Sequence, residues 1–260
     1  MKLLHARLAL AAVAGREIHK FLRQPGRLAS SLVRPLLWMV VFAAGIRHMP
    51  DLGQDYRLYL VPGLALMVCL FNGMQSSLAM VYDREMGVMR LLLTAPLPRT
   101  YLLACKLLAG AFLSVLQALA FLLIVVVWGI GLSPLQLLTG LPALVLGALM
   151  LSAFGLVLSV YIRQLENFAG TMNFVIFPMF FLSPALYPIS RMQEAGAMWI
   201  YRLCQFNPFT HAVEAMRAGL HGEMAAGSLF VVIAATLLFY LVAAAGYDPQ
   251  RGLLKSTRGG

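Results

Sequence analysis

The stretch that decides the fold reads DREMGVMRLLLTAPLPRTYLLACK, residues 83–106. It is a charged, amphipathic segment between two long runs without charged residues, Leu58–Tyr82 and Leu107–Ile162. Such runs predict helices that cross a bilayer, because about 20 mostly apolar residues span its hydrocarbon core. Residues 83–106 are therefore a polar connection between membrane spans, where the protein can meet a soluble partner.

The composition of the whole chain also indicates a membrane protein. Of its 260 residues, 61% are hydrophobic and 12% are charged, whereas about 25% are charged in a typical soluble domain. The net charge of +10 does not indicate a nucleic-acid partner. The basic residues gather at the ends of apolar runs rather than along one face, which is the pattern of membrane topology.

The apolar pattern predicts an all-α protein with six membrane spans. They cover about 28–46, 58–82, 107–131, 141–162, 167–190 and 224–247. The run 107–162 is long enough for two spans, and it is divided at residues that break or turn helices: Gly129, Gly131, Ser133, Pro134, Gly140 and Pro142. Arg34 is close to one end of the first span, from where its side chain can extend to the interface. Pro178 and Pro184 are expected to kink the fifth.

The distribution of basic residues predicts that both termini lie in the cytoplasm. Fifteen of the 20 Lys and Arg residues fall on the side of the termini. The five on the opposite side are Arg47, Arg57, Arg191, Arg202 and Arg217. Positive loops stay cytoplasmic. We therefore expect one transmembrane domain over 1–260 in the bacterial inner membrane, with an amphipathic arm (1–27) on the inner leaflet and a cytoplasmic tail (248–260).

Residues 83–99 are expected at the cytoplasmic surface rather than in the bilayer. Each of their five charged residues would add about 2.5–3.5 kcal/mol to the free energy of membrane insertion at a helix centre, whereas a leucine there lowers it by only about 0.5 kcal/mol. The pattern predicts a short helix through Leu93 that Pro96 and Pro98 end. An ordinary interfacial loop helix is the alternative.

On the opposite side, residues 191–223 carry six charged residues together with aromatic ones. Asn207-Pro208 predicts a helix start, because Asn caps free amides and Pro suits the first turn. Glu214 and Arg217 then have the spacing of a surface ion pair. We interpret the region as short amphipathic helices that dip into the outer leaflet. An interfacial loop anchored by aromatic residues is equally open.

Several catalytic signatures are absent from the sequence. It contains no Walker-type phosphate loop, no His-Glu-x-x-His and no Gly-x-Ser-x-Gly. The three cysteines are widely spaced, which supports neither a disulfide framework nor a zinc site. We expect no catalytic residue, no bound cofactor and no metal. The absence of acidic residues from the middle of the spans counts against a proton-coupled carrier. A secondary transporter or channel stays open as the alternative, and an intramembrane hydrolase is a third hypothesis.

Two regions resemble ABC-2 type transporter permeases, the membrane subunits of ATP-binding-cassette exporters. The coupling helix of that family reads Arg-Glu-x-Gly-Thr-x-Glu-x-Leu-x-x-x-Pro-x-x-Arg, with a Lys further on. The matching residues are Arg84, Glu85, Gly87, Leu92, Pro96, Arg99 and Lys106, whereas Val88 and Arg90 replace the usual Thr and Glu. The second matching set is Pro178, Phe181, Ser183, Tyr187-Pro188, Asn207-Pro208 and Arg217. The order of elements agrees over nearly the whole chain.

This resemblance implies a homodimeric permease that works with two copies of a separate ATPase, which would bind ATP and Mg²⁺. The cargo of such a permease moves outward and is an amphiphile, a drug-like molecule or a lipid-linked glycan. The residues implied at the ATPase-coupling interface are Asp83, Arg84, Glu85, Gly87, Arg90, Leu92, Pro96 and Arg99. Those implied in outer gate helices are Tyr187, Pro188, Asn207, Pro208, Glu214 and Arg217.

Overall fold

The computed structural model describes residues 15–16, 18–19, 23, 25–45, 56–86, 98–162, 164–194 and 196–247, and within these ranges its regular secondary structure is entirely α-helix. The helices are α2 (Pro25–Gly45), α3 (Tyr56–Glu85), α5 (Arg99–Val127), α6 (Pro134–Tyr161), α7 (Leu165–Phe181), α8 (Ser190–Glu194), α9 (Met198–Phe206), α10 (Pro208–Leu220) and α11 (Ala226–Gly246). For the described part of the chain, the all-α prediction is therefore confirmed.

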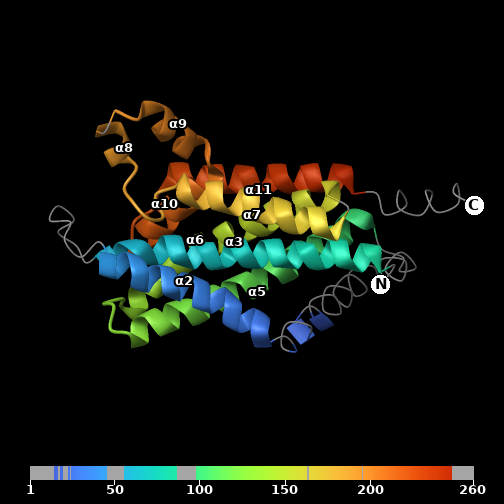
Figure 1. The fold of residues 1–260 in the computed structure, drawn as a ribbon, viewed down its shortest axis with the longest axis horizontal. Helices are drawn as coiled ribbons and strands as arrows, with labels where there is room; N and C mark the ends of the chain where they lie inside the picture. The colour runs from blue at the N-terminus through green and yellow to red at the C-terminus, as the bar shows by residue number, and fades with distance from the viewer. Residues whose placement is uncertain are drawn as a thin grey trace, which may run out of the picture.

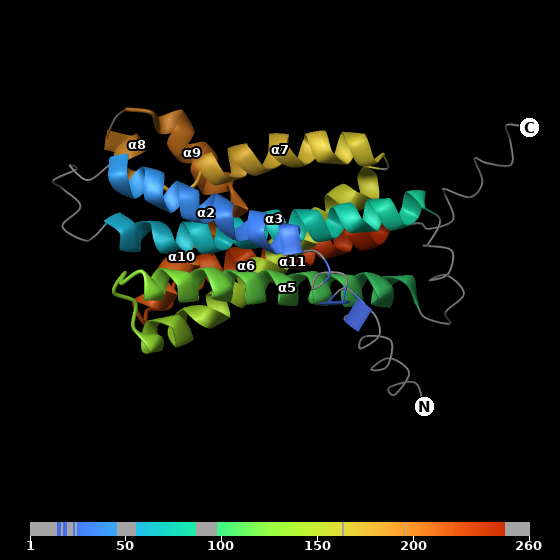
Figure 2. The same ribbon diagram turned by 60° about the horizontal axis from the view of Figure 1, so that its bottom comes forward.

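The long helices run lengthwise beside one another, whereas α8, α9 and α10 gather at one end of the bundle (Figures 1 and 2). Each predicted span overlaps one lengthwise helix, although the ends of some helices differ from the prediction. Four described helices are long and apolar enough to cross a membrane, namely Tyr56–Glu85, Thr100–Val127, Pro134–Tyr161 and Ala226–Gly246. In α2 the apolar stretch is shorter, Ser31–Phe42, and α7 has 17 residues. Six spans, and the side on which the termini lie, thus stay predictions.

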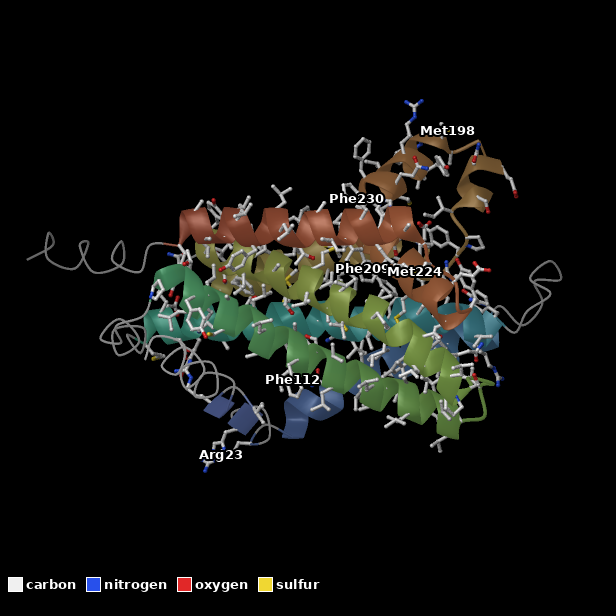
Figure 3. All side chains as sticks on the ribbon, turned by 180° about the vertical axis from the view of Figure 1, so that it is seen from behind. Arg23, Phe112, Met198, Phe209, Met224 and Phe230 are labelled. Atoms are coloured by element: carbon white, nitrogen blue, oxygen red, sulfur yellow. The ribbon has the colours of Figure 1, made fainter. Side chains whose placement is uncertain are left out.

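Helix α3 forms the centre of the bundle. It packs against α2, α5, α6, α7 and α10, and every residue from Leu60 to Met74 is buried. A helix that is apolar on all sides is stable when it is surrounded by protein or by lipid, and α3 is surrounded by protein. The surroundings of α11 differ, because most of its apolar side chains are exposed or half-buried and only Val232 and Ala243 are buried. Figure 3 shows Phe230 on α11 and Phe112 on α5 pointing away from the bundle, as expected of side chains that face lipid.

Helix α6 begins at Pro134 rather than near residue 141. The hydroxyl of Ser133 accepts a hydrogen bond from the Gln136 amide (3.2 Å), and the Gln136 side chain accepts one from the Ser133 amide (2.9 Å). This capping box starts the helix, with Pro134 in its first turn. The turn before it contains Gly129 at φ 77°, a conformation that favours glycine. Pro142, predicted to break or turn a helix, lies inside α6.

Helix α7 ends at Phe181 and does not continue to Ser190 as predicted for the fifth span. Pro178 lies in its last turn, and Pro184 lies beyond its end rather than at a kink. Pro184 also disfavours a helical conformation for Ser183. The segment that follows is therefore non-helical, with carbonyl groups available to other elements.

The side chain of Arg34 does not extend toward the interface. Its guanidinium carbon lies 4.0 Å from the centroid of the Phe71 ring, and Phe71 is midway along α3. An arginine at the centre of a membrane helix costs about 2.5–3.5 kcal/mol on insertion scales. The structure therefore holds a cation at the middle height of the bundle, which the sequence alone did not indicate.

Candidate functional site

The two predicted sites lie at opposite ends of the bundle. One end contains the last turn of α3 and the beginnings of α5 and α7; the other contains α8, α9 and α10 (Figure 1). We call them the α3–α5 end and the α9–α10 end. The long helices run from one end to the other.

Asp83 is the centre of an ion-pair network at the α3–α5 end. Its carboxylate is 2.8 Å from a guanidinium nitrogen of Arg16 and 3.5 Å from the Lys106 ammonium. The Asp83 side chain is only 4% exposed. A buried carboxylate needs such partners to offset its desolvation. Asp83 therefore joins the N-terminal region and α5 to α3, and its carboxylate is buried among these elements.

Glu85 makes a second link at the same end. It is exposed, and one carboxylate oxygen accepts a hydrogen bond from the Leu165 backbone amide at 2.9 Å. Leu165 is the first residue of α7, and the free amides of a helix start are stabilised by an acidic group. The last turn of α3 thus caps α7. The sequence motif contained Glu85 but did not show which helix it would contact.

The other predicted coupling residues are placed only in part. Arg84 is half-buried in the last turn of α3, and Arg99 begins α5. Because α3 continues through Glu85, residues 83–85 belong to this long helix and not to a separate surface helix. The remainder of the predicted helix, including Gly87, Arg90, Leu92 and Pro96, lies outside the described residues.

Arg217 holds α10 against α3 and the segment after α7. Its guanidinium lies over the ring of Tyr59, 4.0 Å from the centroid, and donates a hydrogen bond to the Pro184 carbonyl at 2.7 Å. The Tyr59 hydroxyl donates to the same carbonyl at 3.0 Å. Burial lowers the pKa of Arg217, although nearby Tyr59 and Glu214 oppose that shift. An arginine stays charged in such surroundings.

Asn207 starts α10 as predicted and also fixes its position. Its side-chain oxygen accepts from the Phe209 amide at 3.0 Å, which caps the helix. Its side-chain nitrogen donates to the carbonyls of Met179 (2.6 Å) and Leu182 (2.7 Å). Pro208 occupies the first turn. One side chain thus caps α10 and binds carbonyls at the end of α7.

Glu214 and Arg217 are not joined by the predicted ion pair, because each has a different partner. A carboxylate oxygen of Glu214 accepts from the Ser228 hydroxyl, near the start of α11, at 3.2 Å. Both side chains line an open cavity of about 330 Å³ that Pro188 borders as well. Tyr187 donates a hydrogen bond to the Phe181 carbonyl. Of the six predicted gate residues, Pro188, Glu214 and Arg217 thus line this cavity, whereas Tyr187, Asn207 and Pro208 do not.

Sequence reasoning missed several residues of both sites. Tyr56 and Tyr59 come from the start of α3, where Tyr56 donates to the Leu186 carbonyl at 2.6 Å. The available signal in the sequence was that two tyrosines stand at one end of an apolar run, where their hydroxyl groups would need hydrogen-bond partners. Arg16 is one of several basic residues in the N-terminal arm, and the sequence did not indicate that it pairs with Asp83. Among the residues that the structure places, no group of three His, Cys, Asp or Glu side chains could hold a metal ion.

Comparison with known proteins identifies the family. The chain matches the family described as ABC-2 type transporter over residues 9–221. It is 28% identical to a protein of Cyanophora paradoxa named as a transport permease, ycf38, with 75% of this chain and 68% of that protein aligned. For proteins of the same name, the identity is 29% in Porphyra purpurea (75% and 68% aligned) and 27% in Pyropia yezoensis (80% and 72%). The chain thus belongs to the ABC-2 type transporter family, whose membrane subunits are typically non-catalytic and work with an ABC ATPase.

Proposed function

We propose that this chain is the permease subunit of an ABC exporter, driven by ATP hydrolysis on a separate nucleotide-binding subunit that holds ATP and Mg²⁺. The observation that carries the proposal is the set of links at the α3–α5 end. Asp83 is tied to Arg16 and Lys106, and Glu85 is tied to the start of α7. A force applied to the connection after Glu85 would act on α3, α5 and α7 together.

The proposed assembly is a homodimer with two ATPase copies in the bacterial inner membrane, with six spans and both termini in the cytoplasm. The charge bias of the sequence supports this orientation. It puts residues 83–99 on the ATPase side and α8, α9 and α10 on the outer side. The cavity between Glu214 and Arg217 then lies at the exit, which favours outward movement of an amphiphile, a drug-like molecule or a lipid-linked glycan.

In the proposed cycle, the linked helices carry movement from the ATPase side of the permease to the exit. Closure of the ATPase dimer on ATP would push residues 83–99 of each permease. Because the ion pairs of Asp83 and the hydrogen bond of Glu85 join α3, α5 and α7, these helices would then tilt as a group. At the other end the same helices support the contacts of Tyr59 with Pro184 and of Asn207 with Leu182. Tilting would therefore alter the exit without chemistry in this chain.

The test is ATP hydrolysis by the reconstituted permease–ATPase complex. We expect Glu85→Ala and Gly87→Trp to leave the permease inserted and bound in the membrane, yet to lower transport-coupled hydrolysis several-fold. Glu223→Gln is the matched control, since this exposed acidic residue follows α10 at the other end of the bundle. Unchanged coupling in both variants would refute the proposal. So would transport by the purified chain alone in vesicles with an ion gradient.

A further inference from the structure

Arg34 lies on the exposed face of α2, at the middle height of the bundle. Its neighbours on that face are apolar and at least half exposed: Val33, Leu37, Val40 and Val41. The guanidinium is held over Phe71, which at about 1.5 Å per residue is roughly 20 Å from either end of α3. The cation is thus held far from both ends of the helix that it packs against.

The Arg34 guanidinium keeps hydrogen-bonding capacity that the protein does not use. Within the described ranges, no carboxylate lies at ion-pair distance from it and no acceptor receives its N–H groups. A guanidinium has five N–H donors around its edge. The Phe71 ring covers one face of the plane and leaves that edge open. The side chain is therefore oriented for planar, two-point recognition of an oxyanion.

A cation at this height is not expected to face lipid tails. Charged side chains inside membranes face the protein interior or a water-filled path, and they commonly mark the route of a substrate. In this protein the face around Arg34 is exposed in the single chain. In the proposed membrane orientation, the cation on this surface of α2 therefore requires a polar partner in place of hydrocarbon.

We propose that Arg34 binds the anionic head group of an amphiphilic cargo, a phosphate or a comparable oxyanion, while the apolar face of α2 receives its tail. This rests on the proposed transport function and specifies the class of its substrate. Two sources of the anion are possible in principle, a lipid-like molecule or free phosphate. The apolar neighbours Leu37 and Val41 favour the lipid-like molecule.

Trp38 offers a direct readout, because it is four residues after Arg34 and hence one turn away on the same helix. The full-length permease is placed in phosphatidylcholine nanodiscs, with Trp128→Phe and Trp199→Phe so that Trp38 is the only tryptophan. Brominated dodecyl phosphate and brominated dodecyl maltoside are titrated, and quenching of Trp38 is followed. We expect half-quenching at an about tenfold lower concentration of the phosphate, which corresponds to about 1.4 kcal/mol.

Substitutions of Arg34 test whether its guanidinium causes the preference for the phosphate over the maltoside. Arg34→Gln should bring the two half-quenching concentrations together, and Arg34→Lys should keep part of the difference, because a lysine retains the charge but not the planar fork. Arg202→Gln, which removes an exposed arginine from α9, should preserve the full preference. Inorganic phosphate at the same concentration should not compete. Retention of the preference in Arg34→Gln, or full competition by inorganic phosphate, would overturn the proposal.

Two further results separate this inference from the proposed function. The titration needs neither ATP nor the ATPase. A phosphate preference that persists although the coupling experiment fails would support the anion site alone. Normal coupling without any phosphate preference would remove only the anion site. Loss of a permease dimer in Arg34→Gln, measured by mass photometry, would assign the guanidinium to a contact between copies and also overturn the inference.

Discussion

The carboxylate of Glu85 accepts the backbone N–H of Leu165 at 2.9 Å, so that the end of α3 caps a helix that begins 80 residues later. Both residues lie at the α3–α5 end of the bundle, where we propose that the ATPase binds. The hydrogen bond links the last residue of α3 directly to the first residue of α7. Sequence motifs placed Glu85 in a coupling role, and the structure shows which helix it holds.

Replacing Glu85 with alanine should loosen the start of α7. Without the carboxylate, the Leu165 amide loses its acceptor, and the first turn of the helix frays. Hydrogen exchange measured by mass spectrometry should be faster for 165–168 and unchanged for the first turn of α11. Glu85→Gln, which keeps an acceptor oxygen, should show a smaller increase. Equal exchange in the native and alanine proteins would mean that the contact does not stabilise α7.

Replacing Asp83 with asparagine should strongly destabilise the protein. The change leaves Lys106, whose side chain is 12% exposed, without the charge of its buried partner. Breaking one member of a buried ion pair costs about 3 kcal/mol or more. Thermal unfolding in detergent measures the effect, and Asp83→Asn combined with Lys106→Met should recover part of the loss. A double variant no more stable than Asp83→Asn alone would contradict the pairing.

Replacing Arg217 with lysine should weaken the docking of α10. An ammonium cannot lie flat on the Tyr59 ring while donating to Pro184, so the loss should be about 1–2 kcal/mol. Tyr59→Phe keeps the ring and loses only one hydrogen bond to that carbonyl, so it should cost less. Thermal unfolding of both variants measures which substitution destabilises the protein more. A larger loss in Tyr59→Phe would show that the hydroxyl, not the stacked cation, fixes this end.

Replacing Gly63 with alanine should disturb the contact between α3 and the segment after α7. A Cβ at this position would lie 2.6 Å from the Ala185 Cα and 2.7 Å from its carbonyl oxygen. Backbone atoms cannot move aside as a side chain does, so a loss of about 1–3 kcal/mol is expected. Gly227→Ala is the control, since a Cβ there meets nothing within 4 Å. Equal melting temperatures for both variants would contradict the close approach.

Single cysteines can test the orientation of the bundle. The native Cys69, Cys105 and Cys204 are buried and should react slowly with maleimides. Thr100, in the first turn of α5, and Glu223, just after α10, are exposed, and they belong to the α3–α5 end and the α9–α10 end. A membrane-impermeant maleimide applied to intact cells should label Glu223→Cys, and it should label Thr100→Cys only after lysis. The reverse pattern would place α8, α9 and α10 in the cytoplasm and refute the proposed direction of export.

The sequence by itself determined the helical class, the order of the lengthwise helices and the helix start at Asn207-Pro208. These features follow from local properties, namely runs of apolar residues and the capping chemistry of single residues. The sequence also contained the Ser133–Gln136 capping box, which gives the true start of α6. Reading Gly140 and Pro142 as breakers obscured that signal.

Only the tertiary structure decided which residues meet. Asp83 with Arg16 and Lys106, Arg217 with Tyr59, and Arg34 with Phe71 each join separate elements of the fold. No local pattern specifies such pairs, because they depend on how the helices pack and at what height. The same reason explains the missing Glu214–Arg217 pair: packing offered each side chain a partner from another element, and these contacts replaced the neighbour on its own helix.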